Sequence, residues 1–236
     1  MITDLDKKER SIFIGDIHGC YEELKKLLKK INYSPEKDRL ISLGDLIHKG
    51  PKSAKVIRFF HKNNIEVIMG NHDWTFYQTL LGKNEMYNEA KKILKKLELS
   101  QEELITWFQS MPFYIEGQDF IAVHGALNPS EKKFYKTSPE EMLFGRYYDS
   151  KSKSVLSRAK NKKEPHISPW YKAYPESFSQ NKTIIFGHWA NPEAIIYKRF
   201  RGLDTGCCYG GHLSCYILPD DEIVQVKSKQ DKMYNY

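Results

Sequence analysis

The sequence predicts a layered α/β fold, because short apolar runs alternate with amphipathic helical runs and most apolar runs end in a polar, glycine-flanked loop. The 236 residues are enough to bury a substantial core, and we expect one domain over 1–236. A hydrophobic fraction of 40% and a charged fraction of 28% are ordinary for a globular protein.

The first half is predicted to alternate strand and helix. Strands are predicted at 11–14, 39–43 and 65–69. Helices are predicted between them, at 20–31 and 53–62. Two consecutive βαβ units imply parallel strands joined by right-handed crossovers. A helical section from about Trp74 to Ser110 follows, in which Ser100 and Glu103 form a capping box that opens a new helix.

The second half has more strands and shorter connections. Strands are predicted at 119–123, 183–186, 194–198, 213–218 and 222–226. A helix is expected over 142–148, because Ser138, Pro139 and Glu141 supply a cap, a first-turn proline and a capping acid. Residues 150–168 are rich in Lys, Ser and Asn, so we expect a surface loop or a mobile excursion over the site.

Composition limits the partners. A formal charge of +7 comes mainly from lysines scattered over helix faces, which favours a solubilising surface over a nucleic-acid platform. Such a field would still attract anionic substrates. Four cysteines without a CxxC pair favour reduced thiols and a cytoplasmic setting. Residues 1–10 lack the apolar core of a signal peptide, and no run approaches the ~18–20 apolar residues of a membrane span.

Five loops place Asp, Asn or His directly after an apolar run. They are GDIHG at 15–19, GDLIHKG at 44–50, GNHD at 70–73, HG at 124–125 and GH at 187–188. Because open α/β sheets bind ligands at the carboxyl ends of their strands, we expect these loops to converge on one site. The candidate metal ligands are Asp16, His18, Asp45, Asn71, His124 and His188.

The candidate donors are hard oxygens and imidazole nitrogens without a thiolate. This mixture suits Mn²⁺, Fe, Co²⁺ or Zn²⁺ better than an all-oxygen Ca²⁺ or Mg²⁺ cage. Six donors suit two ions ~3.5–4 Å apart that share a carboxylate and lower the pKa of a bridging water towards ~7. A lone Asp or His is more often a turn or core residue, and we expect that of His61, His166 and His212.

The ordered motifs resemble the calcineurin-like metallophosphoesterases of the phosphoprotein-phosphatase branch, over 12–226. FGHWA at 186–190 and LDTGCCYGG at 203–211 are similar to the symmetrical diadenosine tetraphosphatases, the ApaH-like group. The resemblance implies a central β-sandwich of mixed sheets flanked by helices. It implies that Asp16 and His18 bind one ion and that Asp45 bridges both. The second site is then completed by Asn71, His124 and His188.

The resemblance also implies roles for residues around the ions. His72 would protonate the leaving-group oxygen or stabilise the transferring phosphoryl group, which is worth ~10²–10⁴-fold for a general acid. Protein phosphatases of this branch carry Asp-Arg where this chain has His48-Lys49, and the Asp normally orients the catalytic histidine. Asp73 is one candidate for that task here. Lys49 supplies charge without the planar fork of Arg.

Three further side chains are candidates for substrate binding. Arg146 lies where bacterial relatives place a phosphate-binding arginine. Tyr209 and Trp189 lie in glycine-bounded loops, where an aromatic face could stack on adenine, worth ~1–3 kcal/mol. Core packing is an equally open interpretation of Trp189.

The implied function is a phosphohydrolase with two divalent ions, Mn²⁺ or Co²⁺ first and Fe or Zn as alternatives. It would split diadenosine tetraphosphate symmetrically into two ADP by attack of a metal-bound hydroxide. A Ser/Thr-type protein phosphatase with the same ions is the alternative, and inorganic polyphosphate or capped RNA ends are further anionic candidates. A non-catalytic module on this scaffold should have lost a ligand, and none is lost. No specific nucleic-acid or membrane partner is expected, and the oligomeric state stays open.

Overall fold

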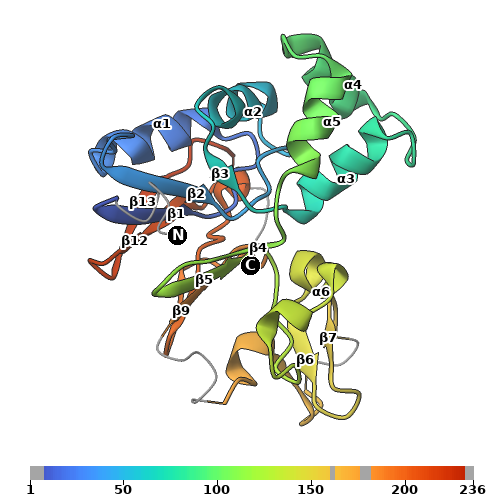
Figure 1. Cartoon of the computed structure of the whole chain (residues 1–236), viewed down its shortest axis with the longest axis vertical. Helices are drawn as coiled ribbons and strands as arrows, with labels where there is room; N and C mark the ends of the chain where they lie inside the picture. Colours follow the sequence, from blue (N-terminus) through green and yellow to red (C-terminus); the bar gives the residue numbers. More distant parts are fainter. Residues whose placement is uncertain (1–7, 160–162, 176–181, 232–236) are drawn as a thin grey trace.

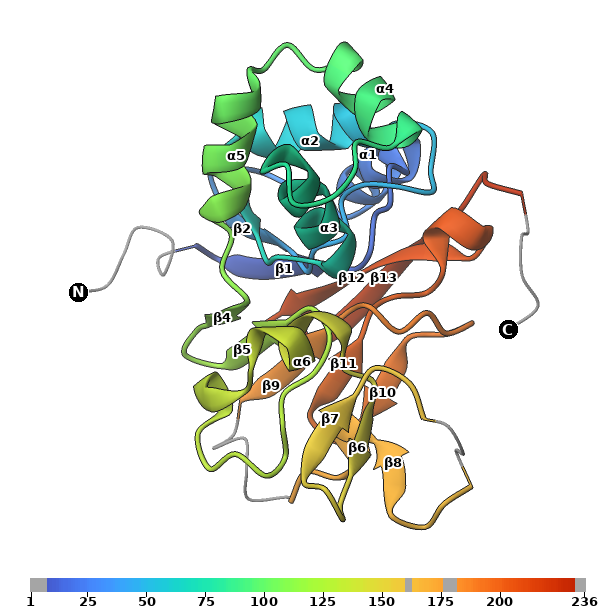
Figure 2. The same cartoon turned by 90° about the vertical axis from the view of Figure 1, so that its right-hand side faces the viewer.

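The computed structural model describes residues 8–159, 163–175 and 182–231. Two five-stranded mixed sheets form the centre, helices cover the outer side of the first, and a three-stranded sheet lies beyond the second (Figures 1 and 2). The prediction of a β-sandwich of mixed sheets flanked by helices is confirmed. All four cysteines are buried and free.

The first sheet has the strand order β13-β12-β1-β2-β3. Its strands are β1 (Arg10–Ile14), β2 (Asp38–Ser42), β3 (Glu66–Val67), β12 (His212–Leu218) and β13 (Glu222–Lys227). The predicted parallel pairs β1–β2 and β2–β3 are present, and β12 runs antiparallel to both β1 and β13. The crossovers are α1 (Tyr21–Lys30) and α2 (Ser53–Lys62), both close to the predicted bounds.

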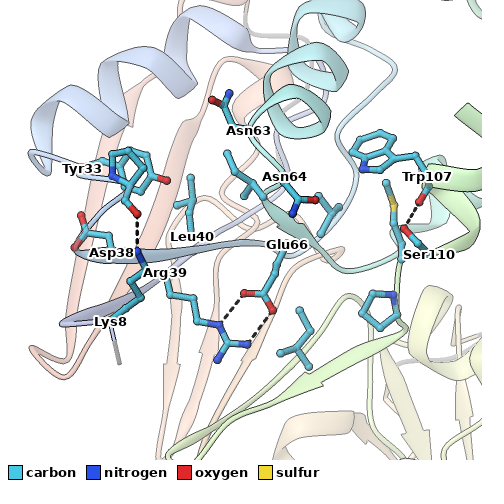
Figure 3. A pocket seen from close by; sticks show the side chains of 16 residues that line it. Lys8, Tyr33, Asp38, Arg39, Leu40, Asn63, Asn64, Glu66, Trp107 and Ser110 are labelled. Atoms are coloured by element: carbon cyan, nitrogen blue, oxygen red, sulfur yellow. Dashed lines mark hydrogen bonds and ion pairs between the residues drawn. The ribbon is translucent and has the colours of Figure 1, made fainter. Parts of the chain in front are cut away.

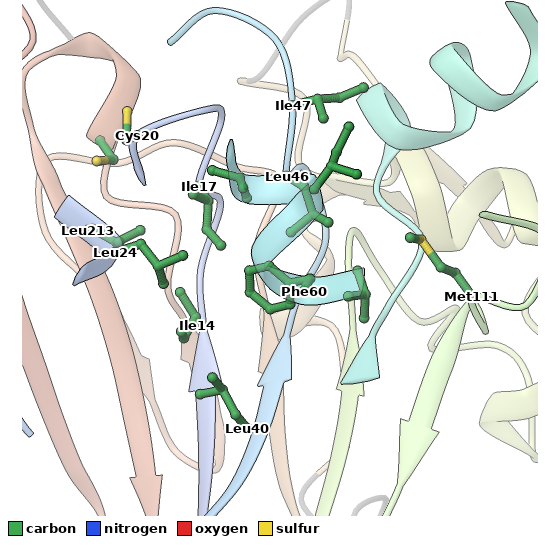
Figure 4. Close-up of a cluster of buried hydrophobic side chains, with 14 of the residues drawn as sticks. Ile14, Ile17, Cys20, Leu24, Leu40, Leu46, Ile47, Phe60, Met111 and Leu213 are labelled. Atoms are coloured by element: carbon green, nitrogen blue, oxygen red, sulfur yellow. The ribbon is translucent and has the colours of Figure 1, made fainter. Parts of the chain in front are cut away.

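Alternation along β1 divides the core into layers. Ile12 and Ile14 pack towards the helices, in the cluster that also holds Leu24 and Phe60 (Figure 4). Phe13 faces the other way and meets the second sheet, where its ring lies 4.7 Å from that of Phe120. A strand buried on both faces therefore fixes the sheet between two apolar layers.

The helical section consists of α3 (Asn71–Leu80), α4 (Asn88–Lys96) and α5 (Gln101–Gln109). The predicted capping box opens α5, since the Glu103 N–H donates to Ser100 Oγ at 3.1 Å and the Ser100 N–H donates to Glu103 Oε2 at 2.7 Å. Helix α3 begins at Asn71, before the predicted start near Trp74. The Asp73 carboxylate accepts the Gly70 N–H and satisfies the first turn, so the helix starts inside the GNHD loop.

The second sheet has the order β10-β11-β9-β5-β4. Its strands are β4 (Tyr114–Glu116), β5 (Phe120–Val123), β9 (Thr183–Phe186), β10 (Ile195–Tyr197) and β11 (Phe200–Gly202). β5, β9 and β11 are parallel, whereas β4 and β10 are antiparallel edges. The sequence analysis missed β4 and β11, because three residues are too few to show a periodicity.

Two predictions for the second half were wrong. The helix expected over 142–148 is α6 (Pro139–Phe144), and the chain then enters a strand. The supposed loop 150–168 holds two more strands of a small sheet with the order β7-β6-β8, although 160–162 lie outside the described residues. The strands are β6 (Tyr147–Asp149), β7 (Ser154–Leu156) and β8 (Ile167–Pro169).

The reason for the third sheet is an aromatic core next to it. Trp170 is fully buried, with its ring 5.1 Å from Phe186 of β9 and 5.5 Å from Phe200 of β11. Trp170 directly follows β8, so burying it anchors the small sheet on the outer face of the second sheet. The described part of the chain also holds short 3₁₀ helices: η2 (Phe134–Lys136), η3 (Trp170–Lys172) and η4 (Cys207–Tyr209).

Candidate dinuclear metal centre

The five motif loops meet at the carboxyl ends of β1, β2, β3, β5 and β9. Backbone hydrogen bonds hold them together: the His18 N–H donates to the Asp45 carbonyl at 2.8 Å, and the Gly187 N–H donates to the His124 carbonyl at 2.9 Å. The side chains of all six predicted ligands come together there.

Asp45 lies in the middle of the cluster. Its Oδ2 is 3.4 Å from His18 Nε2 and its Oδ1 is 3.6 Å from His124 Nε2. Two groups of potential ligand atoms are present among the described residues, and within each group all atoms lie within 4.8 Å of one another. One group is His18, Asp45 and His72, and the other is Asp16, Asp45 and His124. Asp45 is the residue common to both groups, which is the position that a bridging carboxylate requires.

Asn71 closes the other side of the cluster. Its Oδ1 lies 3.0 Å from His124 Nε2 and 2.8 Å from His188 Nδ1. Asp16 completes the set, with Oδ2 3.9 Å from His18 Nε2.

Backbone carbonyls fix which nitrogen each histidine offers. Nδ1 of His18 lies 2.9 Å from the Ile47 carbonyl, Nδ1 of His124 lies 2.8 Å from the Leu43 carbonyl, and Nε2 of His188 lies 3.2 Å from the Phe144 carbonyl. A carbonyl only accepts, so we assign the proton to that nitrogen and a lone pair to the opposite nitrogen. In all three rings this opposite nitrogen faces the cluster, as in histidines that bind metals.

Burial makes this cluster of carboxylates unfavourable without cations. Burial, together with the charges of Asp204 and Asp45, raises the pKa of Asp16 well above its usual value. Burial also raises the pKa values of Asp45 and Asp204. Asp16 Oδ2 is buried and has no hydrogen-bond partner. Orphaned carboxylate oxygen and free imidazole lone pairs are the donor set that divalent ions satisfy.

The backbone is strained where the ligands sit. His18, Asp45 and His188 have φ values of 44°, 53° and 63°, in the left-handed region that non-glycine residues rarely occupy. Two candidate ligand carboxylates lie so close to the backbone that the neighbouring residue must be glycine. A Cβ on Gly70 would lie 2.3 Å from Asp45 Oδ1, and one on Gly187 would lie 2.2 Å from Asp16 Oδ1. Strain and close packing hold the ligand atoms in a fixed arrangement.

His72 is oriented by His48 and not by Asp73. The Nδ1 atoms of His48 and His72 lie 2.9 Å apart, and the Tyr87 hydroxyl is hydrogen-bonded to Nε2 of His48. The Asp73 carboxylate instead accepts the backbone N–H groups of Leu46, at 3.1 Å, and Gly70, at 3.3 Å. The suggestion that Asp73 orients His72 is therefore wrong, because its carboxylate caps α3 and ties it to the Asp45 loop.

The predicted substrate-binding residues Lys49, Arg146 and Tyr209 border the cluster, and the stacking candidate Trp189 lies beside it. Lys49 Nζ lies 2.9 Å from His18 Nε2 and 5.1 Å from the centre of the Tyr209 ring. Arg146 Nη2 donates to the His188 carbonyl at 3.4 Å, and the charges of Asp16 and Asp204 act on its guanidinium. The Trp189 ring lies 4.7 Å from that of Tyr147, in the aromatic cluster beside the centre.

The sequence analysis did not assign two residues of this site, His48 and Asp204. His48 was noted only as a departure from the family pattern. The available signal was its place in the GDLIHKG loop, three residues after the candidate ligand Asp45. Asp204 lies in the quoted LDTG stretch and follows the end of β11, as the other acids follow their strands. It is 7% exposed and its charge reaches both Asp16 and Asp45.

A separate cavity of about 530 Å³ lies at the opposite ends of β2 and β3, which supply Asp38, Arg39 and Glu66 to its wall (Figure 3). Arg39 forms a two-pronged ion pair with Glu66 at 2.7 and 2.8 Å. No predicted site residue lines this cavity, so the candidate chemistry belongs to the carboxyl ends of the strands.

The family model for calcineurin-like phosphoesterases matches residues 10–224. The chain belongs to this family. Calcineurin-like phosphoesterases use a dinuclear centre of divalent metal ions. No helix among the described residues is long and apolar enough to cross a membrane.

Several curated relatives of this phosphoesterase carry the name symmetrical bis(5'-nucleosyl)-tetraphosphatase. The protein of Buchnera aphidicola is 30% identical, over 88% of this chain and 94% of the relative. The protein of Vibrio parahaemolyticus is 27% identical, over 89% of this chain and 96% of the relative.

Solved structures show the same fold. A crystal structure of a protein assigned as a diadenosine tetraphosphatase superposes with a TM-score of 0.78 at 24% identity, covering 93% of both chains. A protein serine/threonine phosphatase from Saccharomyces cerevisiae superposes with a TM-score of 0.59 at 14% identity, covering 98% of this chain and 82% of its own.

Proposed function

We propose that this phosphoesterase, as a single cytoplasmic domain, hydrolyses diadenosine tetraphosphate symmetrically to two ADP. The observation that carries the proposal is the match to symmetrical tetraphosphatases over nearly their full length, with every candidate ligand gathered at one centre. The protein-phosphatase alternative is less supported, since the serine/threonine phosphatase likeness is at 14% identity and shows the fold alone.

The residues fit a pair of divalent ions, for which Mn²⁺ or Co²⁺ is the first choice. Asp16 and His18 would hold one ion, Asp45 would bridge, and the remaining donors are Asn71, His124 and His188. When bound, such ions polarise phosphoryl oxygens and make hydroxide available near neutral pH.

The surrounding cations bind the substrate. Arg146 presents a guanidinium that can grip one phosphate through two N–H groups, whereas Lys49 adds a point charge beside His18. Both partly offset the negative charge of a tetraphosphate chain as it leaves water.

His72 offers the hydrogen on its Nε2 atom as a hydrogen-bond donor to the reacting oxygens, because its Nδ1 edge is engaged with His48. We infer that the Tyr87 hydroxyl donates to Nε2 of His48, so that His48 donates from Nδ1 to Nδ1 of His72. The proton of neutral His72 then sits on Nε2, from which the ring can donate a hydrogen bond to the leaving-group oxygen. Burial, with the charge of Lys49, lowers the pKa of His72 to about 3, which agrees with a neutral ring.

Product analysis tests the function. Protein loaded with Mn²⁺ or Co²⁺ is expected to convert diadenosine tetraphosphate to ADP alone, as separated by anion-exchange chromatography. ATP plus AMP, or no turnover, would overturn the assignment. A higher kcat/KM on a phosphopeptide than on the dinucleotide would instead favour the protein-phosphatase alternative.

The hydrogen-bond series from Tyr87 through His48 to His72 gives a second prediction. Tyr87→Phe is expected to lower kcat about 2- to 10-fold, the value of one hydrogen bond, with KM unchanged. His48→Ala is expected to lower kcat further. His48→Asp instead places a carboxylate that accepts from His72 Nδ1 and favours a protonated ring that still donates from Nε2, so it should retain more activity. Steady-state kinetics on the three variants measure this, with Tyr33→Phe, a half-buried tyrosine of the distant cavity, as the matched control. A wild-type kcat in His48→Ala would exclude the orienting role.

A further inference from the structure

A cavity of about 400 Å³ adjoins the metal centre on the side of the small third sheet. Its volume falls within the range of small-molecule sites. Two segments far apart in the sequence form it, the start of β6 with the residues after β7, and the loop that follows β9. Its lining consists of Arg146, Tyr147, Ser157, Arg158 and Trp189 with two alanines.

Part of the cavity lining is an aromatic ring, Trp189, that neighbouring rings hold in place. Trp189 is half-buried, and the rings of Tyr147 and Tyr171 pack against it at 4.7 and 6.4 Å. Its main chain is fixed on both sides, since its N–H donates to the Gly187 carbonyl at 2.7 Å and its carbonyl accepts Asn191 Nδ2 at 2.6 Å. The packing interpretation and the stacking interpretation of Trp189 are thus compatible, because the supported ring still lines the cavity.

The cavity lining is also positively charged. Arg146 and Arg158 both line the cavity, and none of its described lining residues is acidic. Burial lowers the pKa of Arg146, and the nearby charge of Arg158 lowers it further. Two guanidinium groups close enough to repel each other beside an acid-free cavity favour an anionic ligand.

Arg146 joins this cavity to the metal centre. Its Nη2 donates to the carbonyl of His188, and its Nη1 donates to the carbonyl of Ser157, each at 3.4 Å. His188 and Trp189 are consecutive residues, so the aromatic wall starts one residue after a candidate ligand. A phosphate chain lying on the centre can therefore continue past Arg146 into the cavity.

We propose that this cavity binds one nucleoside arm of the substrate, with the base against Trp189 and the adjoining phosphate between Arg146 and Arg158. The proposal rests on the proposed function for the identity of the substrate, a dinucleoside polyphosphate. It assigns Trp189 and Arg158 to substrate binding, and it explains why the small sheet is built beside the centre. Symmetric cleavage needs a site that holds a nucleoside diphosphate.

Kinetics with and without a nucleobase test the proposal. Trp189→Ala is expected to raise KM for diadenosine tetraphosphate about 5- to 100-fold, from the stacking of one base. The effect on hydrolysis of inorganic polyphosphate, which has no ring to stack, should be smaller. Trp189→Phe keeps an aromatic face and should lie near the wild type. An unchanged KM in Trp189→Ala would overturn the proposal.

Arg158→Ala should raise the same KM more modestly, because it removes a charge and leaves the ring. Arg58→Ala, an arginine of α2 whose side chain is 42% exposed, is the matched control and should leave KM unchanged. Equal effects of the two arginine variants would attribute the change to net charge and remove Arg158 from the site.

Direct binding separates this proposal from the proposed function. By calorimetry on the Mn²⁺-loaded protein, ADP should bind more tightly than inorganic pyrophosphate, and Trp189→Ala should remove that preference. If the protein does not hydrolyse the dinucleotide but ADP binding depends on Trp189, the nucleoside site stands and the proposed function falls. If hydrolysis is symmetric but Trp189→Ala leaves ADP affinity unchanged, only the nucleoside site falls.

Discussion

Asp45→Asn is expected to abolish metal binding and hydrolysis while leaving the fold intact. The Asp45 carboxylate is the member common to both clusters of ligand atoms, so its loss weakens both ion sites at once. We expect Mn²⁺ affinity to fall by more than the ~10–100-fold typical of residues that merely support a ligand. Asparagine keeps an oxygen for the His72 N–H, which donates to Asp45 Oδ1 at 2.8 Å, and it tolerates the left-handed φ of 53°.

Relative to the wild type, Asp45→Asn should be equally or more stable without metal and less stable with Mn²⁺. Because burial raises the pKa of Asp45, its ionised form costs stability in the metal-free protein, and this cost grows as pH rises from the unfolded pKa through the folded one. Metal-free Asp45→Asn should therefore unfold at equal or higher urea than the metal-free wild type at pH 8. With Mn²⁺ at 100 times its Kd, the wild type should gain about 2.7 kcal/mol and the variant almost nothing.

Elemental analysis and urea titrations with and without EDTA measure these effects. Asp119→Asn changes an exposed acid remote from the centre and should match the wild type in every measurement. Full metal occupancy in Asp45→Asn would show that this carboxylate does not bridge two ions.

The sequence predicted those parts of the fold that local periodicity encodes. The parallel strands and α1 and α2 were found because Leu24, Leu27 and similar positions repeat at a fixed spacing. β4, β7, β8 and β11 were not, since each has three residues and owes its pairing to partners distant in the sequence. The small third sheet depends on Trp170 docking against β9 and β11, which no local pattern reveals.

The site was predictable to a greater extent, because each ligand follows a strand and the ends of parallel strands converge. What the motifs could not show is which side chains meet across loops. His48 reaches His72 and Tyr87, residues 24 and 39 positions away, and that contact depends on how α3 and the segment before α4 fold over the centre. Asp73 was assigned to His72 by adjacency in sequence, yet in the first turn of a helix neighbouring side chains point apart.

His72→Asn is expected to keep both ions and to lose rate. Removing one hydrogen-bond donor to the charge that develops in the transition state costs about 10²–10³-fold, so kcat should fall by that amount while KM changes little. Combining His72→Asn with His48→Ala should cost little more than His72→Asn alone, because His48 acts through His72. His61→Asn, on α2 and packed against Trp107, is the matched control and should keep the wild-type kcat.

Metal analysis of His72→Asn decides between two roles that the geometry allows. His72 lies in one of the two groups of potential ligand atoms, with His18 and Asp45, so it is close enough to bind an ion directly. Its Nδ1, however, is taken by His48, and its ring meets that of His18 edge-on at 4.9 Å. Loss of one ion together with activity would make His72 a ligand, whereas two retained ions and a slow enzyme identify it as the hydrogen-bond donor to the reacting oxygens.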